Sequence, residues 1–390
     1  MSHAPPDRSS NRALWALMTG NVVIGTGVMV VPGALNDISV SLGVSIPQAG
    51  QLITAAAILM GLGAPLFAGL VAGWDRRRLL TASLIWYGVM MGISALAPNY
   101  ATLLPLRVLT VIAPAIFTPQ AAASVGLLVK PEQRGRAITF VFLGWSVASV
   151  LGTPFSAWIS EVASWRWAFG LVAVIALVVA AWLWRVMPTG IRPAALNRQA
   201  WATTLGSPTL MLTVSVTLVY SFGQFTLFSY FAPYLHQTLG ATGGMIALLF
   251  LWFGAFGLMG NVGLSRWVDR IGASRAVLLT IGLIALSLVL WPLGRHGLWP
   301  QALIMVPWGL GCFASNSAQQ ARLVHLSPAL APATVALNTS AMYGGQAMGA
   351  ALGGALIAQG HLLRLHEVSL VVMLAAMALS LWASRLQKRS

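Results

Sequence analysis

The sequence predicts an all-α membrane protein with twelve transmembrane helices, arranged as two six-helix halves. Three observations support this class. First, 58% of the 390 residues are hydrophobic and only 7% are charged, whereas soluble domains carry about 25% charged residues. Second, apolar segments of about 20 residues, enough to cross a bilayer core of about 30 Å, recur along the chain. Third, a long polar interval divides these segments into two equal sets.

The expected helices are the apolar segments that lie between polar or proline-containing loops. Their spans are 13–35, 47–72, 79–97, 102–129, 137–160, 166–187, 208–235, 242–264, 276–294, 298–321, 332–358 and 367–384. The first span is long enough to stay in the membrane as an uncleaved insertion signal. The longest polar interval predicts an N-terminal half of residues 1–187, a linker of residues 188–207 and a C-terminal half of residues 208–390.

The basic residues predict the orientation of these helices. The chain has 22 Lys and Arg against 7 Asp and Glu, which gives a formal net charge of +15. With the N-terminus in the cytoplasm, 18 of the 22 basic residues fall on the cytoplasmic side, three fall on the outer side, and Arg107 lies within the fourth span. This is the positive-inside distribution. We therefore expect an inner-membrane protein embedded in the lipid bilayer, with both termini cytoplasmic and no nucleic-acid partner.

The two halves contain similar segments, which predicts an internal duplication. GLVAGWDRRRLL (69–80) follows the second span, and GLSRWVDRIGASRAVLL (263–279) follows the eighth. The glycine-rich sequences GWSVASVLGTP (144–154) and YGGQAMGAALGG (343–354) lie in the corresponding fifth and eleventh spans. Such duplication is typical of transporters whose halves move around a central binding site.

The glycines and the proline of the fifth and eleventh spans are candidates for packing or hinge positions. In a water-exposed helix an internal proline costs roughly 3 kcal/mol and a glycine about 1 kcal/mol. In lipid, however, small residues let two helix backbones approach closely. We expect a close packing surface with a hinge, and static packing is the alternative. The residues are Gly144, Gly152 and Pro154 in the fifth span and Gly345, Gly349 and Gly353 in the eleventh.

These segments resemble the major facilitator superfamily, within it the drug:proton antiporter branch that includes sugar, arabinose and purine efflux permeases. GWSVASVLGTPFSAW resembles the antiporter signature of helix 5, and SWRWAF (164–169) resembles the entry to helix 6. FGQFTLFSYFAPYL (222–235) and LNTSAMYGGQAMGAALGG (337–354) resemble the helix 7 and helix 11 segments. The resemblance covers almost the whole chain. It implies the major facilitator fold and proton-coupled efflux of a drug, sugar or nucleoside-like solute by alternating access.

The loop after the second span resembles the signature of the superfamily in part. Asp75 and Arg76 match it, but its second glycine is missing, and the later copy keeps Asp269 and Arg270. In the family these loops clamp the halves together in one conformation. The resemblance therefore implies a cytoplasmic latch at these four residues, and an ordinary positive-inside loop is the alternative.

Arg107 and Asp37 are the candidates for coupling. An intramembrane arginine is costly unless it has a function, and LPLRVLTVIAP resembles the helix 4 motif whose arginine is implicated in proton transfer. The alternative is a side chain that extends to the outer interface. None of the seven acidic residues falls at mid-membrane, and Asp37, at the outer end of the first span, either titrates there or is simply solvated. Proton exchange is thus implied by the resemblance alone.

Polar residues in the middle of the spans are candidates for the wall of a substrate cavity. By resemblance, helices 1, 4, 7 and 10 line the centre. Each amide could instead join two helices, which we favour for Asn338 and Gln346, whereas we favour a cavity position for Asn21 and Gln224. Neutral side chains interleaved with aromatic rings suit an uncharged or amphipathic solute. The candidates are Asn21, Thr26, Gln120, Gln224, Tyr230, Asn316 and Asn338.

The sequence also limits the possible functions. Neither lysine ends a G-x-x-x-x-G-K-[ST] motif, so ATP hydrolysis through a phosphate loop is excluded. We expect a monomer that is not an enzyme and that has no cofactor and no metal site. Two alternatives to proton-coupled efflux stay open. One is an uncoupled facilitator or a symporter for a small metabolite, which the lack of a mid-membrane acid favours; the other is a membrane receptor that transports nothing.

Overall fold

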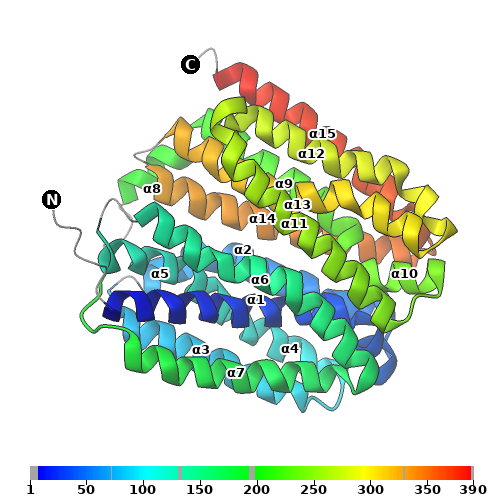
Figure 1. Cartoon of the computed structure of the whole chain (residues 1–390), viewed down its shortest axis with the longest axis horizontal. Helices are drawn as coiled ribbons and strands as arrows, with labels where there is room; N and C mark the ends of the chain where they lie inside the picture. Colours follow the sequence, from blue (N-terminus) through cyan, green and yellow to red (C-terminus); the bar gives the residue numbers. More distant parts are fainter. Residues whose placement is uncertain (1–7, 72, 131–133, 193–197, 328–329, 388–390) are drawn as a thin grey trace.

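The computed structural model describes residues 8–71, 73–130, 134–192, 198–327 and 330–387, and these residues are almost entirely helical (Figure 1). The helices are α1 (Arg8–Leu42), α2 (Ile46–Leu70), α3 (Arg76–Ala95), α4 (Tyr100–Thr110), α5 (Ile112–Leu128), α6 (Arg134–Val162), α7 (Trp165–Val186), α8 (Arg198–Leu205), α9 (Pro208–Phe228), α10 (Phe231–Leu239), α11 (Gly243–Ile271), α12 (Ala273–Leu290), α13 (Leu298–Leu326), α14 (Ala331–Ala358) and α15 (Leu365–Gln387). Two short 3-10 helices, η2 (Trp291–His296) and η4 (Leu362–Arg364), lie at one end of the bundle.

Two of the expected spans are interrupted. The fourth is divided into α4 and α5 at Val111, and the seventh is divided into α9 and α10 at Ser229 and Tyr230. Each interruption lies three or four residues before a proline, Pro114 or Pro233. Because proline has no N–H group, it cannot donate to the carbonyl four residues earlier, and its ring also displaces that carbonyl.

The structure accounts for the twelve expected spans. Within the part of the chain that it describes, ten helical segments are long and apolar enough to cross a membrane. Helices α13 and α14, with 29 and 28 residues, are also of spanning length but contain more polar and glycine residues. Such helices belong inside a bundle, where neighbouring helices can contact their polar groups.

The helices form two bundles that lie side by side (Figure 1). In the first bundle α1 packs along α6 and α3 packs along α7; in the second, α9 packs along α14 and α12 packs along α13. The two bundles meet along α2 and α14 and along α6 and α11. Helix α1 begins and α15 ends at the same end of the molecule, as an even number of spans requires (Figure 1).

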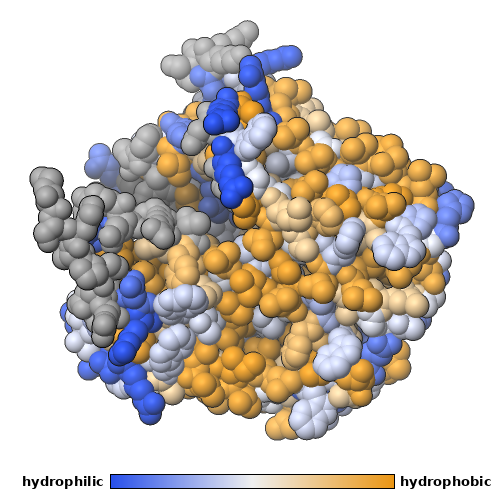
Figure 2. Space-filling view, viewed as in Figure 1, coloured by the Kyte–Doolittle hydropathy of each residue, from blue (hydrophilic) through white to orange (hydrophobic). Residues whose placement is uncertain are grey.

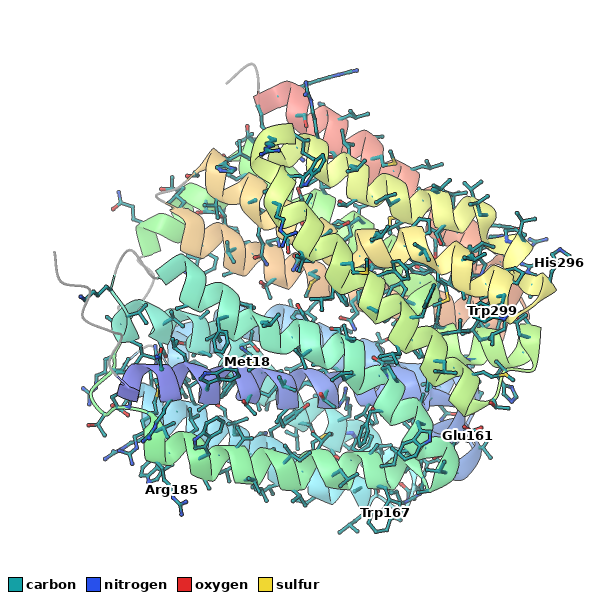
Figure 3. The ribbon with its side chains drawn as sticks, viewed as in Figure 1. Met18, Glu161, Trp167, Arg185, His296 and Trp299 are labelled. Atoms are coloured by element: carbon teal, nitrogen blue, oxygen red, sulfur yellow. The ribbon has the colours of Figure 1, made fainter. Side chains whose placement is uncertain are left out.

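On the face shown in Figure 2, the surface is apolar over the middle of the bundles, with hydrophilic side chains towards the two ends. Large exposed side chains such as Leu248, Val178 and Trp252 contribute to the apolar surface. Trp167 and Trp299 lie at one end and Arg185 lies at the other (Figure 3). Tryptophans near one end of the helices and arginine at the other suit the two interfaces of a bilayer.

Candidate functional site

Two cavities lie between the two bundles. The first is lined by Val28, Ile53, Ala56, Ala57, Met60 and Arg107 from the first bundle and by Gln346 from the second. The second is lined by Met29, Ser149 and Thr153 from the first bundle and by Gln224, Phe225, Phe228, Phe250, Phe253, Cys312 and Phe313 from the second. In this conformation the first cavity has room for about one water molecule, and the second is also too small for an organic solute.

Among the described residues that line the first cavity, Arg107 is the one that carries a charge. Its side chain is 2% exposed, and it donates one hydrogen bond to the carbonyl of Gly27 and one to that of Val28, each at 3.0 Å. The Val28 carbonyl is available because Pro32, one turn later in α1, has no N–H group to donate to it. The buried Nε of Arg107 has no hydrogen-bond partner.

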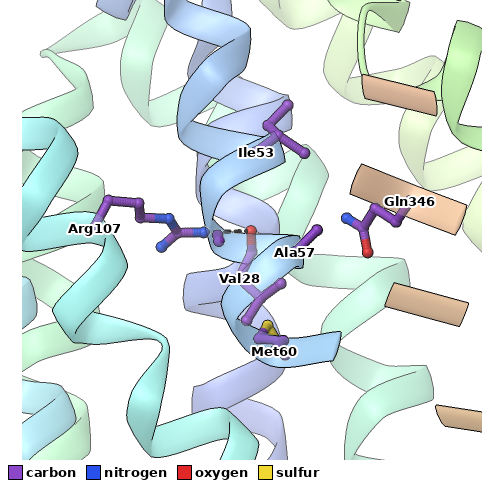
Figure 4. Close-up of a pocket in the computed structure, with 7 residues that line it drawn as sticks. Val28, Ile53, Ala57, Met60, Arg107 and Gln346 are labelled. Atoms are coloured by element: carbon purple, nitrogen blue, oxygen red, sulfur yellow. Dashed lines mark hydrogen bonds between the residues drawn. The ribbon is translucent and has the colours of Figure 1, made fainter. Parts of the chain in front are cut away.

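Gln346 faces Arg107 across this cavity. Figure 4 shows the two side chains on opposite sides, with Val28 and Ala57 between them. Gln346 is 6% exposed, and its amide makes no hydrogen bond with the rest of the described chain. The cavity therefore contains an amide and a guanidinium nitrogen that both have unused hydrogen-bonding capacity.

The second cavity is mainly aromatic. The Phe228 ring lies against the rings of Phe225 and Phe253, with centroids 5.6 and 5.4 Å apart. Gln224 supplies the main polar group in this wall, and its buried Oε1 has no partner. An aromatic wall with one free hydrogen-bond acceptor fits an apolar group that carries a donor.

Most of the other expected cavity residues join helices to one another. Asn21 is fully buried; its Nδ2 donates to the carbonyl of Val141 at 3.1 Å, and its Oδ1 accepts from Thr118 at 2.9 Å. It therefore connects α1 to α5 and α6. Thr26 packs against Gly152 of α6, and Gln120 lies buried on α5.

In the second bundle, Asn338 and Asn316 belong to a buried hydrogen-bond network. The Nδ2 of Asn338 donates to Oδ1 of Asn316 at 3.0 Å, and its Oδ1 accepts a short hydrogen bond from Thr217. Gln319 also donates to Thr217, at 3.1 Å. Asn338 thus bonds to α9 through Thr217 and to α13 through Asn316 in this conformation. Tyr230 lies at the contact of α9, α14 and α2, where its hydroxyl donates to the carbonyl of Ala350 at 2.8 Å.

The expected glycine positions lie where two helices of the same bundle touch. A methyl group on Gly144 would collide with the backbone of α1, and one on Gly152 would lie 3.0 Å from Cα of Thr26. On α14 the three glycines repeat every four residues against the backbone carbonyls of α9: Gly345 at Leu218, Gly349 at Phe222 and Gly353 at Thr226. Helix α6 continues through Pro154 without interruption. These residues therefore form two equivalent packing contacts, α6 with α1 and α14 with α9.

Asp75 and Arg76 bind within the first bundle in this conformation. The Asp75 carboxylate caps α3 by accepting from the backbone N–H of Arg78, and it also accepts from the N–H of Gly190, after α7. Arg76 is buried and donates to the carbonyls of Val71 and Trp74. Asp269 and Arg270 lie in the last turn of α11, and Arg270 is exposed.

Asp37 lies within α1, which extends to Leu42 and so beyond the expected end of the first span. Its Oδ2 accepts from the backbone N–H of Trp165 at 2.6 Å, at the start of α7. The side chain is half-buried. Asp37 is therefore neither a freely solvated acid nor a wall residue of the two cavities; it anchors the N-terminus of α7, where a negative charge is favourable.

Glu161 joins the two bundles at the end opposite Arg185 (Figure 3). Its Oε1 accepts from the backbone N–H of Gly243 at 2.9 Å, at the first residue of α11. A methyl group on Gly243 would lie 2.7–2.9 Å from the Glu161 side chain, so the contact requires glycine. The sequence gives little indication of this contact, because an acidic residue at a helix end usually faces water.

Three comparisons with known proteins place the chain among transporters. The Major Facilitator Superfamily profile matches residues 17–350 and 213–389. The chain is 28% identical over 352 residues to the inner membrane transport protein YdhP of Escherichia coli K12, with 90% of each chain covered. It is 25% identical over 331 residues to a probable sugar efflux transporter of Pasteurella multocida, with 85% of this chain and 82% of the relative covered.

A solved structure supports the fold. A point mutant of the nucleoside transporter NupG superposes with a TM-score of 0.75 at 12% identity, over 95% of this chain and 100% of NupG. At this identity the similarity concerns the fold alone. It agrees with two six-helix bundles that meet around central cavities.

Proposed function

Because the chain belongs to the Major Facilitator Superfamily and is a multi-pass membrane transporter, we propose that it exports a small organic solute by alternating access. One observation carries this proposal: both cavities have walls from both bundles. A solute held there contacts both halves, so rocking one half against the other exposes it first to one side and then to the other. The similarity to a probable sugar efflux transporter supports export as the direction.

We also propose that the protein works as a monomer in a bacterial inner membrane, with both termini in the cytoplasm. The clustering of 18 of 22 basic residues on one side supports this orientation. The similarity to an inner membrane protein of Escherichia coli supports this location. In this proposal residues 1–187 and 208–390 are the two moving halves, and residues 188–207 link them.

Proton exchange is the energy source that we propose for export. The sequence contains no phosphate loop, which supports an ion gradient rather than ATP hydrolysis by this chain as the energy source. Arg107 would transmit the coupling by holding or releasing the carbonyls of Gly27 and Val28, and the proton itself would bind another group, because a guanidinium group does not give up its proton. Movement of these carbonyls would alter α1 at its proline, where the helix is weakest.

A second candidate function is uncoupled facilitation. The observation that favours it is that Asp37, Asp75 and Glu161 each bind a backbone N–H group at a helix terminus or loop. A carboxylate in a dry cavity is the usual group whose protonation changes during transport. The described cavity walls contain no such carboxylate.

One experiment tests export and separates the two candidates. The purified protein is placed in liposomes, and the movement of labelled sugars, nucleosides, lipophilic cations and aromatic carboxylates is followed with and without an imposed pH gradient. Acceleration by an opposing proton gradient is the result expected of proton exchange. Transport at equal rates in both conditions would identify a facilitator, and no transport of any solute above that of protein-free liposomes would contradict the proposed function.

A further inference from the structure

We propose that the first cavity binds the anionic head of an amphipathic solute, such as a carboxylate, between Arg107 and Gln346. This inference rests on the proposed function and specifies the solute class that the site selects. It differs from the uncharged solute that the neutral side chains of the sequence suggest. The site is built from two buried, incompletely bonded polar side chains that face one another from the two halves (Figure 4).

Arg107 carries a charge that no described carboxylate balances. Its two hydrogen bonds go to neutral carbonyls, those of Gly27 and Val28. A guanidinium group has five N–H donors, so several remain available, including the unpartnered Nε. Carbonyl dipoles compensate a buried charge only in part, whereas an anion supplies the opposite charge and forms the stronger, charge-assisted hydrogen bonds.

Asp37 and Glu161 are engaged at helix ends and do not face Arg107 from a cavity wall. The carboxylate of Asp37 binds the N-terminus of α7, and that of Glu161 binds the N-terminus of α11. Neither lies in the wall of a cavity. The centre of the described molecule therefore has a positive potential, which favours anions and disfavours cations.

Gln346 completes the site from the other half. Its amide N–H₂ can donate to the same anion that accepts from Arg107, and it has no competing partner in the described chain. An anion held by both side chains would connect the two halves. Solute binding would then favour conformations in which the cavity is wide enough for the anion to touch both Arg107 on α4 and Gln346 on α14.

The second cavity can hold the apolar body of such a solute. It is lined mainly by phenylalanines, among them Phe228 and Phe253. Val28 in the first cavity and Met29 in the second are consecutive residues of α1, so both cavities border the same turn. An acid with an aromatic or aliphatic tail fits this pairing of a charged and an apolar wall.

A purely structural role for Arg107 makes a different prediction. If Arg107 only supports α1 at the carbonyl that Pro32 leaves free, a charge at Gln346 should not alter ligand selectivity. Gln346→Glu leaves the hydrogen bonds of Arg107 to α1 in place but adds an anion on the opposite side of the cavity. It therefore distinguishes a binding site from a helix support without removing Arg107.

The test measures binding and so does not depend on transport. Three probes of equal size are used: 4-phenylbutyrate, 4-phenylbutanamide and 4-phenylbutylammonium. Their affinities for the purified full chain are measured by quenching of tryptophan fluorescence and by ligand-induced thermal stabilisation. We expect the anion to bind at least about tenfold more tightly than the amide, with the cation weakest.

Variants then locate the site. Gln346→Glu should weaken anion binding by about tenfold or more and strengthen cation binding, because the new carboxylate neutralises Arg107. Gln359→Glu is the matched control, since it adds the same charge at an exposed position at the end of the same helix. Arg107→Gln should remove the preference for the anionic probe. Arg166→Gln is the control, because it removes one positive charge outside the cavities and should leave that preference unchanged.

Specific results would overturn this inference. They are cation binding by the wild type as tight as anion binding, no anion binding at all, or an unchanged anion preference in folded Gln346→Glu. These results are separate from those that test transport. A chain that binds the anion but moves no solute would contradict the proposed function alone, and a chain that transports only cations would contradict the anion site alone.

Discussion

Replacing Gly254 with alanine should shift the equilibrium between conformations of the transporter. Gly254 lies on α11 where this helix crosses α6 of the other half. A methyl group there would lie 2.7 Å from Cα and 3.2 Å from Cγ2 of Val150. Because carbon atoms in good contact are about 3.5–4.0 Å apart, α6 and α11 would have to separate by nearly 1 Å.

The magnitude follows from the cost of overpacking. Inserting a methyl group into a tight contact costs about 1–3 kcal/mol, and only the conformation in which α6 and α11 are this close bears that cost. A free-energy change of 1–3 kcal/mol corresponds to a shift of about 5- to 150-fold in the population of the competing conformation. Helix propensity acts within α11 in both conformations, so it does not produce this shift.

Cys312 provides the assay, because it is the only cysteine of the chain and it lines the second cavity. Its side chain is 4% exposed in this conformation. Alkylation by N-ethylmaleimide therefore requires the cavity to open, and the rate follows the open population when opening is fast. We expect Gly254→Ala to be alkylated about 5- to 150-fold faster than the wild type, well below the unfolding temperature.

A matched control is available on the same helix. Gly263 has no atom within 4 Å of the position that a methyl group would occupy, so Gly263→Ala should be alkylated at the wild-type rate. If Cys312 in Gly254→Ala were alkylated at the same rate as in the wild type, the reasoning would be refuted. Equal acceleration in both variants would also refute it, since it would indicate a general effect on α11.

Three further predictions concern the helix contacts. Gly152→Leu should abolish transport while the protein still inserts into the membrane, because the new side chain cannot fit against α1; solute uptake and surface labelling check this. Glu161→Ala should accelerate alkylation of the central cysteine, because the contact with Gly243 between the halves is lost. Asp37→Ala should lower thermal stability by roughly 0.5–2 kcal/mol through loss of the acceptor for the N–H of Trp165, with transport retained.

Each of these predictions has a contradicting result. Transport at the wild-type rate by Gly152→Leu would show that close contact of α6 with α1 is unnecessary, and Gly170→Leu, which meets nothing within 4 Å, is its control. An unchanged alkylation rate in Glu161→Ala would mean that the contact between the halves does not restrain opening. Loss of pH-driven transport by Asp37→Ala at wild-type stability would identify Asp37 as a proton carrier.

The sequence predicts the helices well because each span is a long apolar segment, and bilayer thickness fixes its length. The sequence predicts the interruptions less well, because prolines in similar apolar segments interrupt the helix in some cases and not in others. Pro114 and Pro233 follow breaks in the helix, whereas α6 continues through Pro154. Helix α6 is held by α1 on one side and by α11 on another, so its direction is fixed by packing around the proline.

The faces of the central helices could not be predicted from the sequence. The sequence favours a cavity position for Asn21 and a helix contact for Gln346, yet the structure places Asn21 between three helices and Gln346 in a cavity wall. One residue changes the direction of a side chain by about 100° on a helix. A helix whose residues are small and apolar on every face has no periodic pattern in its sequence that shows which face points inward.

Four acids, Asp37, Asp75, Glu161 and Glu367, lie at the N-terminal ends of helices and away from the cavity walls. Asp37 binds the first residue of α7, Asp75 caps α3 and Glu161 binds the first residue of α11. Glu367 lies in the first turn of α15. Each negative charge is thus placed at the positive end of a helix, where it is stabilised without needing a basic side chain.

Within the part of the chain that the structure describes, Arg107 has no acidic partner and bonds only to carbonyls. A buried arginine that is paired with a carboxylate is electrically neutral as a unit, and it would discriminate little between solute charges. Here the acids stabilise helix ends, and the arginine retains its charge at the contact of the two halves.

If a solute anion supplies the missing charge, it should stabilise the closed contact between the halves in proportion to its binding. Solute at saturating concentration should then slow the alkylation of Cys312, and in Gln346→Glu, where an internal carboxylate replaces the anion, this protection should be lost.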